Sequence, residues 1–533
     1  MDILTSGNGT AVPKSGSSFN SSSYVNWATQ NLTNWGIAAT ILVLLISYDQ
    51  TMYLIRKKSI PGPSFKIPFM GSFIQALYPK FEAYQEQWAS GDISCVSVFH
   101  KFVVLASERD IARKVFNSTA FVKPCLIPVA ESLLGASAWV FLDGKRHVDF
   151  RRGLNVLFTR KALQCYLPMQ EKVWSQYFEK FVAIGKKNGP IPFMGQFREI
   201  NCALSCRTFV GDYISQAAVK KIADDYYCIT AALELVNIPL SIYFPYSKVW
   251  LGKRAADGVL AEFKKCAAAS RLSMAAGREP TCTMDQWILS MIESKAYKEK
   301  VAAGTATSEE LENSKPTVLL RDFTDFEIAQ TMFTFLFASQ DASSSATTWL
   351  FQIMAQRPDI LNKVREENLA AREKSMKSGQ SLGLEMLESL TYTNAVVKET
   401  LRYRPPVIFV PYTTKKPFKI TPTYTVPKGA MIVPSCYPAL HDPEVYPRPD
   451  VFDPERWISG NAAEQTKNWL VFATGPHNCI AQQYVQLTMT AMIGKASIEM
   501  DWVHHPTARS DEIKVFATLF PMDDCPMIFT KRE

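Results

Sequence analysis

The longest hydrophobic pattern in the chain predicts a buried helix from about residue 324 to residue 356. Thr324 and Glu327 form a capping box, which marks a helix start, and Pro358 ends the pattern. At 1.5 Å per residue, roughly 33 residues give a helix ~50 Å long. Apolar residues cover every side of its first half, which is typical of a helix inside a large core.

A polar segment, S-Q-D-A-S-S-S at residues 339–345, interrupts this helix. Burying it costs free energy unless its polar groups find partners, and its hydroxyls can bond back to carbonyls and bend the helix. The alternative is that the helix emerges into solvent at this point. Apolar residues return at 349–354 and argue against that alternative, so we expect the polar segment to be buried.

The N-terminal region changes character twice. Residues 1–34 are rich in Ser, Asn, Gly and Thr and are expected to be disordered. Residues 35–55 are about long enough for one membrane helix, which needs ~20 residues, and a short interfacial anchor is the alternative. The run R-K-K at 56–58 places the N-terminus outside the cytosol and the main body within it. Residues 56–74 contain several prolines and predict an extended strap.

The remaining residues, 75–533, favour one mainly helical domain with small β-sheets. Helical spacing dominates residues 170–278. Residues 93–106 and parts of 407–434 show the alternation of short strands. Residues 121–143 are apolar without a clear period, and we expect a long loop there that could line a lipophilic pocket.

Composition narrows the class of protein. The chain is 47% hydrophobic, which is enough for a large core, and its net charge of +8 comes without a long basic run or a nucleic-acid-binding motif. We therefore expect no nucleic-acid partner. The 11 cysteines include no C-x-x-C pair, which argues against zinc and against a disulfide framework. The main body should therefore lie in a reducing compartment.

The loop F-A-T-G-P-H-N-C-I-A, residues 472–481, carries the first candidate chemistry. It places Cys479 behind a Gly-Pro turn and directly before a helix-like stretch. A thiolate there would face free N–H groups and the positive end of the helix dipole, which suits a deprotonated, metal-bound cysteine. A buried structural cysteine is the commoner case, and the loop alone leaves both interpretations open.

Two further patterns change this balance. Glu399 and Arg402 stand at i, i+3 on a predicted helix, and P-E-R-W at 454–457 contains Arg456. The ordered set of a polar break in a long helix, E-x-x-R, P-E-R-W and F-x-x-G-x-x-x-C resembles the cytochromes P-450 over roughly residues 56–533. The segments F-L-F-A-S-Q-D-A-S-S-S-A, G-P-H-x-C and F-A-T-L-F-P-M-D-D-C resemble most closely the fungal sterol 22-desaturases.

The resemblance implies the cytochrome P-450 fold, an α-rich domain with a long central helix and a β-rich lobe, and haem b (iron-protoporphyrin IX) as cofactor. It implies that Cys479 is the axial ligand of the haem iron, because an electron-rich thiolate favours O–O cleavage. It assigns proton delivery through water to Asp341 and Ser343, and haem-propionate contacts to His147, Arg151 and His477. It assigns cofactor binding within the cysteine loop to Phe472 and Gly475. It also implies a buried ion-paired triad of Glu399, Arg402 and Arg456.

Four positions depart from the common P-450 pattern. His477 stands where most members have arginine, and His147 replaces a common tryptophan. Ala481 replaces the usual glycine two residues after the cysteine. Ala342 stands where many members have the oxygen-activating threonine, so water could take over part of the role given to Ser343.

The resemblance further implies a microsomal enzyme that introduces a side-chain double bond in ergosterol biosynthesis. It would sit in the endoplasmic reticulum membrane as a single-pass protein with a cytosolic catalytic domain. NADPH-cytochrome P-450 reductase would supply electrons, and the basic stretch 145–161 is a plausible docking face for it. Another P-450 reaction, such as sterol 14α-demethylation or lipid hydroxylation, is the nearest alternative. A non-catalytic haem- or sterol-binding protein, or a membrane-anchored scaffold without haem, is the alternative of another class.

Overall fold

The computed structural model divides the chain into two units, Met1–Lys58 and Ser59–Glu533. It describes residues 21–68, 70–72, 80–99, 101–125, 128–234, 239–304, 307–377, 383–515 and 518–533.

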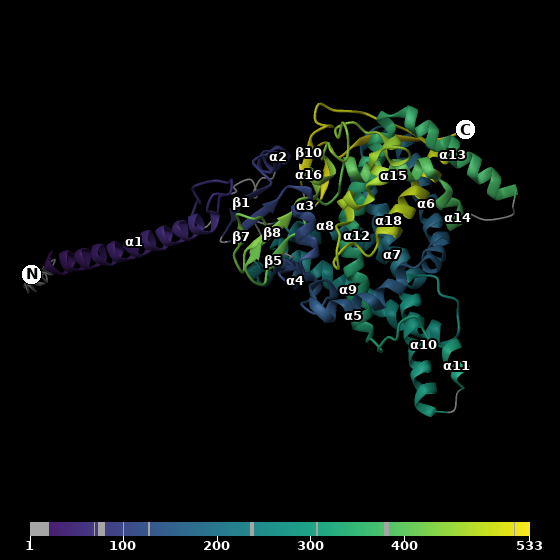
Figure 1. The fold of residues 1–533 in the computed structure, drawn as a ribbon, viewed down its shortest axis with the longest axis horizontal. Coiled ribbons are helices and arrows are strands. Elements are labelled where there is room, and N and C mark those ends of the chain that lie inside the picture. The colour runs from purple at the N-terminus through teal and green to yellow at the C-terminus, as the bar shows by residue number, and fades with distance from the viewer. Residues whose placement is uncertain are drawn as a thin grey trace, which may run out of the picture. The chain divides into compact units, whose positions relative to one another are not determined.

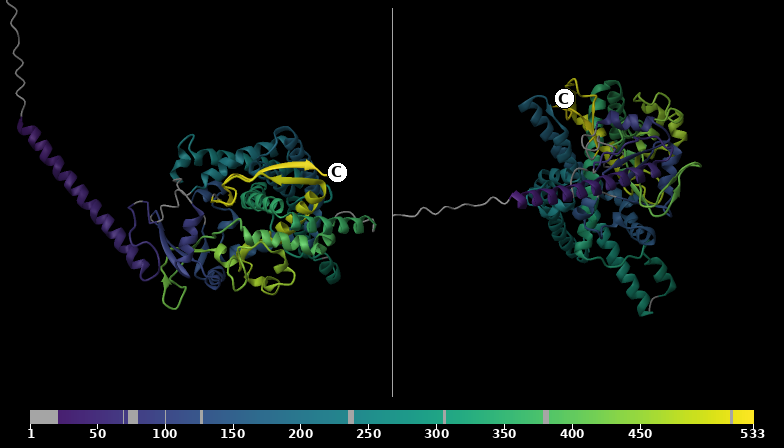
Figure 2. Two further views of the ribbon diagram at one scale, coloured as in Figure 1. Left: turned by 90° about the horizontal axis from the view of Figure 1, so that it is seen from above. Right: turned by 90° about the vertical axis from the view of Figure 1, so that its left-hand side faces the viewer.

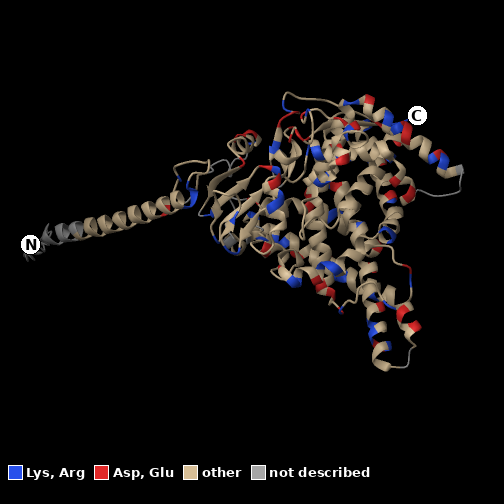
Figure 3. Cartoon of the chain, in the orientation of Figure 1, with Lys and Arg blue, Asp and Glu red and all other residues tan. Residues whose placement is uncertain are grey.

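The first unit consists of one long helix, α1 (Ser21–Lys57). Its stretch Gln30–Lys57 contains an 18-residue window with a mean hydropathy of 1.5 and is long and apolar enough to cross a membrane. The α1 ribbon carries almost no charge until its basic C-terminal end (Figure 3). The helix suggests a membrane anchor, as predicted. It starts earlier than predicted, so the expected disorder is wrong for residues 21–34, where neither proline nor glycine interrupts the helix. Residues 1–20 lie outside the described residues.

The second unit is mostly helical, as the sequence predicts. Its helices are α2 (Phe81–Ala89), α3 (Arg109–Asn117), α4 (Pro128–Leu134), α5 (Gly144–Asn155), α6 (Arg160–Asn188), α7 (Met194–Val210), α8 (Gln216–Ala232), α9 (Lys248–Ala275), α10 (Thr283–Ala303), α11 (Ser308–Asn313), α12 (Asp325–Gln356), α13 (Pro358–Lys377), α14 (Leu384–Ser389), α15 (Thr391–Tyr403), α16 (Cys436–Leu440), α17 (Asn461–Glu464) and α18 (Gln482–Glu499).

The strands form small separate sheets, and the predicted fold class is therefore confirmed. The largest sheet has the order β1-β2-β8-β5-β3, in which β2 and β8 are parallel and the other neighbours antiparallel. β12 pairs with β9 and β4 near the C-terminus (Figure 2, left). The strands are β1 (Ile93–Val98), β2 (Lys101–Ala106), β3 (Val122–Pro124), β4 (Ile191–Pro192), β5 (Tyr412–Thr414), β6 (Phe418–Lys419), β7 (Thr425–Val426), β8 (Met431–Pro434), β9 (Met500–His504), β10 (Ile513–Val515), β11 (Leu519–Pro521) and β12 (Pro526–Lys531).

The long helix α12 organises the helical part of this unit. Its capping box is present, because the Glu327 N–H donates to the Thr324 hydroxyl and the Thr324 N–H donates to the Glu327 carboxylate. It packs against α7 and α9. The strands β1, β5 and β8 lie on one side of the unit, whereas α6, α7, α12 and α18 lie on the other (Figure 1). The polar segment 339–345 remains within the protein, since Asp341 is only 7% exposed.

The predicted loop at residues 121–143 is wrong as a description of that segment. It contains β3, the helix α4 and a short 3-10 turn at Trp139–Phe141. β3 pairs with β5, which follows it by almost three hundred residues. A strand that short has no sequence period of its own, so its pairing depends on a partner that the local pattern cannot reveal.

Candidate active site

The loop that carries Cys479 is closed by its own backbone. The Cys479 N–H donates to the Phe472 carbonyl over 2.9 Å, and the Asn478 N–H donates to the Gly475 carbonyl over 3.1 Å. Gly475 has a φ of +77°, and a Cβ there would lie 2.6 Å from the Phe116 carbonyl oxygen. Only glycine meets both conditions, so Gly475 sets the turn that carries the cysteine.

The sulfur of Cys479 lies at the start of α18. Burial raises the pKa of the Cys479 thiol, while a hydrogen bond from the Ala481 N–H and the charge of Arg151 oppose that rise. The residue nevertheless has exposed surface. The sulfur is thus reachable by a ligand and flanked by groups that stabilise an anion.

Two histidines and an arginine meet beside this loop. The Arg151 guanidinium of α5 donates to the Asn478 side chain over 2.8 Å. The rings of His147, also on α5, and His477 are stacked with centroids 3.9 Å apart. Burial lowers the pKa of His147, and burial together with His147 lowers the pKa of His477 to about 4. Both rings are therefore neutral near pH 7, and each retains one N–H donor.

Trp139, which the sequence analysis did not single out, completes this cluster. Its ring is nearly parallel to that of His147 at 6.5 Å. Its indole N–H is buried without a hydrogen-bond partner among the described residues, and the same holds for one carboxylate oxygen of Asp143. The other oxygen of Asp143 accepts from Lys415 over 2.8 Å. A buried donor without a partner points to an acceptor that the polypeptide does not supply.

These groups fit haem. An accessible sulfur stands beside cationic and neutral N–H donors, which is the donor set that an iron porphyrin with two carboxylates requires. A bare metal ion fits less well, because no group of three His, Cys, Asp or Glu side chains in the described part of the chain could hold one.

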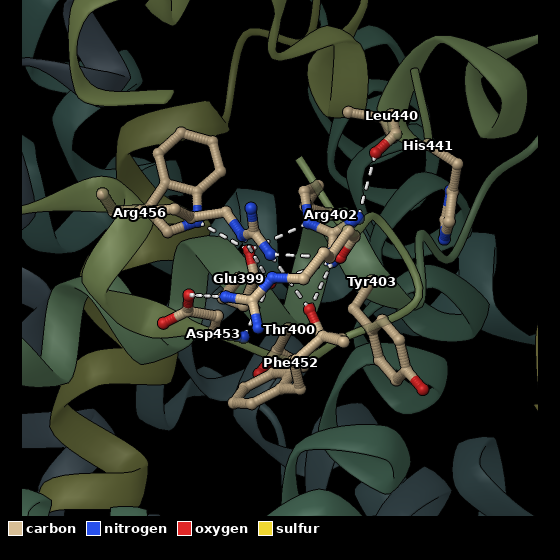
Figure 4. Close-up of polar contacts among 12 residues, drawn as sticks. Glu399, Thr400, Arg402, Tyr403, Leu440, His441, Phe452, Asp453 and Arg456 are labelled. Atoms are coloured by element: carbon tan, nitrogen blue, oxygen red, sulfur yellow. Dashed lines mark hydrogen bonds and ion pairs between the residues drawn. The ribbon is translucent and has the colours of Figure 1, made fainter. Parts of the chain in front are cut away.

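The triad predicted from the sequence is assembled around one carboxylate (Figure 4). Glu399 of α15 accepts two hydrogen bonds from Arg402, both of 2.9 Å, and one of 3.0 Å from Arg456. The Trp457 indole N–H adds a bond of 2.9 Å, and the Asp453 N–H one of 3.0 Å. Glu399 and Arg402 are fully buried. Every lone pair of the buried carboxylate is thereby used, which is the condition for tolerating such a charge.

A family model for cytochrome P450 matches residues 60–501. The chain belongs to the cytochrome P450 family. Haem iron is therefore its cofactor, and Cys479, in its Gly-Pro loop, remains the predicted axial ligand.

Among curated relatives, the chain is 66% identical to the C-22 sterol desaturase ERG5B of Gibberella zeae, over 93% of this chain and 92% of the relative. It is 63% identical to the cytochrome P450 monooxygenase oblE of Emericella variicolor, over 93% of each chain. It is 51% identical to the C-22 sterol desaturase ERG5 of Saccharomyces cerevisiae, over 93% of this chain and 90% of the relative. A solved retinoic-acid-bound cyanobacterial CYP120A1 matches with a TM-score of 0.72 and 21% identity, covering 89% of this chain and all of that one, which shows the same fold.

Asp341 of this P450 does not face the same way as Ser343. The Asp341 carboxylate forms an ion pair with Arg198 of α7 and accepts from the Thr230 hydroxyl of α8 over 3.0 Å. A buried carboxylate needs such partners, and α7 and α8 supply them. Ser343 instead lines a small cavity against α7 and α18. Two residues apart on a helix, the two side chains point to different faces. Their roles in proton delivery stay predictions.

Gly475 and Ala481 of the cysteine loop should differ in how much a substitution destabilises the protein. Gly475→Ala should cost more than about 2 kcal/mol of unfolding free energy, because it combines a left-handed φ with a clash against backbone. Ala481→Gly is the matched control: Ala481 has a φ of −97°, open to any residue, so the change should stay within about 1 kcal/mol. Thermal unfolding and haem content of the purified proteins measure both. Equal losses would contradict the geometry of this loop.

Proposed function

We propose that this chain is a haem-thiolate sterol C-22 desaturase of ergosterol biosynthesis. The observation that carries the proposal is its 66% identity, over nearly the whole of both chains, to a relative named C-22 sterol desaturase. The reaction balances as one sterol –CH2–CH2– unit, O2, NADPH and one proton giving –CH=CH–, two waters and NADP+. No oxygen atom enters the sterol.

In this proposal the residues of the site hold haem b and position it. Cys479 ligates the iron, and the Ala481 N–H and Arg151 help to keep the sulfur anionic. The cofactor's carboxylates would be held by N–H donors of Arg151, His147, His477 and Trp139. The bound haem activates oxygen so that hydrogen can be removed from the sterol side chain. Phe472 and Gly475 fix the loop that sets the position of the sulfur.

The proposed electron donor is NADPH-cytochrome P-450 reductase. The stretch 145–161 contains basic residues on α5 and at the start of α6, and Arg151 from the same helix reaches the cysteine loop. A basic face close to the sulfur suits a transient electron-transfer partner with an acidic surface. We further propose that α1 spans the endoplasmic reticulum membrane, with the catalytic domain in the cytosol, because Arg56 and Lys57 end that helix.

The decisive experiment combines the full-length holoenzyme with reductase, NADPH and a sterol that is saturated at carbon 22. We expect a product that has lost two hydrogen atoms, with a double bond between carbons 22 and 23. A product that has gained one oxygen atom would instead favour the monooxygenase alternative, which the 63% identity to a relative named monooxygenase makes the second candidate. Loss of a 14-methyl group, or a thiolate haem spectrum without turnover, would overturn the proposal.

A further inference from the structure

The second half of α12 is bonded to the C-terminal segment, which comprises residues 505–515 and 518–525. The Ser345 hydroxyl donates to the Leu519 carbonyl, and the Trp349 indole N–H donates to the same carbonyl over 3.0 Å. The Gln352 amide donates to the Ser510 carbonyl over 3.1 Å. The three α12 side chains stand at i, i+4 and i+7 and therefore share one face of the helix. The segment is thus held to α12 at two of its own carbonyls.

The carboxylate of Asp523 fixes the loop of this segment. One oxygen accepts from the Thr507 hydroxyl over 2.8 Å and from the Ser510 hydroxyl, and the other accepts from the Cys525 N–H over 3.1 Å. Burial raises the pKa of Asp523, but these three hydrogen bonds outweigh burial and lower it. The carboxylate is therefore ionised near pH 7. It holds Ser510, whose carbonyl in turn binds Gln352.

His504, the last residue of β9, is buried where this loop begins, and it is only 8% exposed. Both of its ring nitrogens are buried, and neither has a hydrogen-bond partner among the described residues. A neutral imidazole tolerates such a position better than an imidazolium, which carries a charge and a second N–H donor. Protonation of His504 is therefore unfavourable for as long as the ring stays buried.

The charged groups around His504 do not remove this cost. Burial lowers the pKa of His504, the carboxylates of Asp523 and Asp511 only partly oppose that shift, and the neighbouring histidine adds to it. Arg509 and Glu512 of the same loop pair with each other over 3.1 Å. Strand β12 places an uncharged methionine opposite His504, and the three α12 side chains that bond the segment are also uncharged. No described neighbour therefore makes the protonated ring favourable inside the protein.

We propose that His504 is a pH-sensitive latch on the C-terminal segment: the neutral ring stays buried while the segment is bonded to α12, and the protonated ring moves into water and releases the segment. In the released form the imidazole regains its ordinary pKa of ~6.5, whereas burial lowers the pKa of the bonded form. Below ~6.5 the released form therefore binds more protons, and the bonded form loses stability as the pH falls. Release adds one solvent proton to a ring nitrogen and frees the Ser345 hydroxyl of the polar segment 339–345. It does not depend on the reaction that the protein catalyses.

Hydrogen exchange of the full-length holoenzyme tests the latch directly. With intrinsic exchange rates divided out, amide protection in the C-terminal segment should fall about ten-fold in the parent between about pH 7.5 and about pH 5.5, because the released form gains a proton in that range. His504→Phe removes the titrating ring, and its protection should change by less than about two-fold over the same range. His505→Gln is the matched control, because this neighbouring histidine is exposed and its replacement should leave the response of the parent unchanged.

Limited proteolysis gives a second readout, because cleavage follows the population of the open form when opening is fast. At about pH 5.5 the parent should be cut within the C-terminal segment about ten-fold faster than His504→Phe. His504→Gln also lacks a titrating ring and keeps the test valid if the phenylalanine variant does not fold. Equal protection of the parent at both pH values overturns the latch. So does a variant without His504 that loses protection in acid as the parent does.

Discussion

Replacing Cys479 by serine is expected to abolish turnover while leaving the polypeptide folded. The serine hydroxyl is a far weaker acid than a thiol, so it cannot supply the anionic sulfur that the proposed chemistry needs. We expect product formation to fall to background and the reduced CO complex to lose the long-wavelength band of a thiolate haem. Because Ser and Cys differ little in volume, the free energy of unfolding of the apoprotein should change by about 1 kcal/mol or less.

The control for this substitution is another cysteine that lies away from the loop. Cys165 donates its thiol hydrogen to the Pro280 carbonyl, and a serine there can make the same bond. Cys165→Ser should therefore keep the spectrum and the turnover of the parent. A thiolate spectrum that persists in Cys479→Ser would show that another of the 11 cysteines is the ligand and would remove the basis of the proposed site.

The sequence predicts those parts of the site that depend on contacts between residues a few positions apart. The capping box of α12 lies within four residues, and the spacing of Glu399 and Arg402 already places them on one face of α15. The glycine at position 475 predicts the turn, because the φ of +77° found there favours glycine. In each case the interacting residues lie within one or two helical turns of each other in the sequence. The local pattern is therefore enough to predict the contact.

The parts that the sequence could not predict depend on distant partners. Arg198 reaches Asp341 from 143 residues away, and nothing around Arg198 marks it as the counter-ion of a carboxylate on α12. Trp139 likewise becomes informative only when its buried N–H is seen to lack a partner. The backbone at Ala481 is compatible with alanine, because a φ of −97° does not need glycine.

Replacing Glu399 by glutamine is expected to have the largest effect on stability. The amide is nearly isosteric but neutral, so Arg402 and Arg456 lose their counter-ion while remaining almost completely buried. Removing one partner of a buried ion pair costs about 3–5 kcal/mol. Since a folded protein is stable by only about 5–15 kcal/mol, we expect a large drop in the thermal midpoint and in haem content.

A graded series separates the charge of Glu399 from its hydrogen bonds. Trp457→Phe keeps an aromatic ring against Trp469 but removes the 2.9 Å indole bond to the carboxylate. The lost bond should cost about 1.5–3 kcal/mol, the range for a bond to a charged acceptor. Asp224→Asn, in the exposed pair with Lys220 on α8, is the control and should cost about 0.5 kcal/mol or less. Urea unfolding of the three variants measures the order. If Glu399→Gln is no worse than Trp457→Phe, the carboxylate does not act as the counter-ion of the two arginines. The triad would then be a hydrogen-bonded cluster in which the charge of Glu399 adds little.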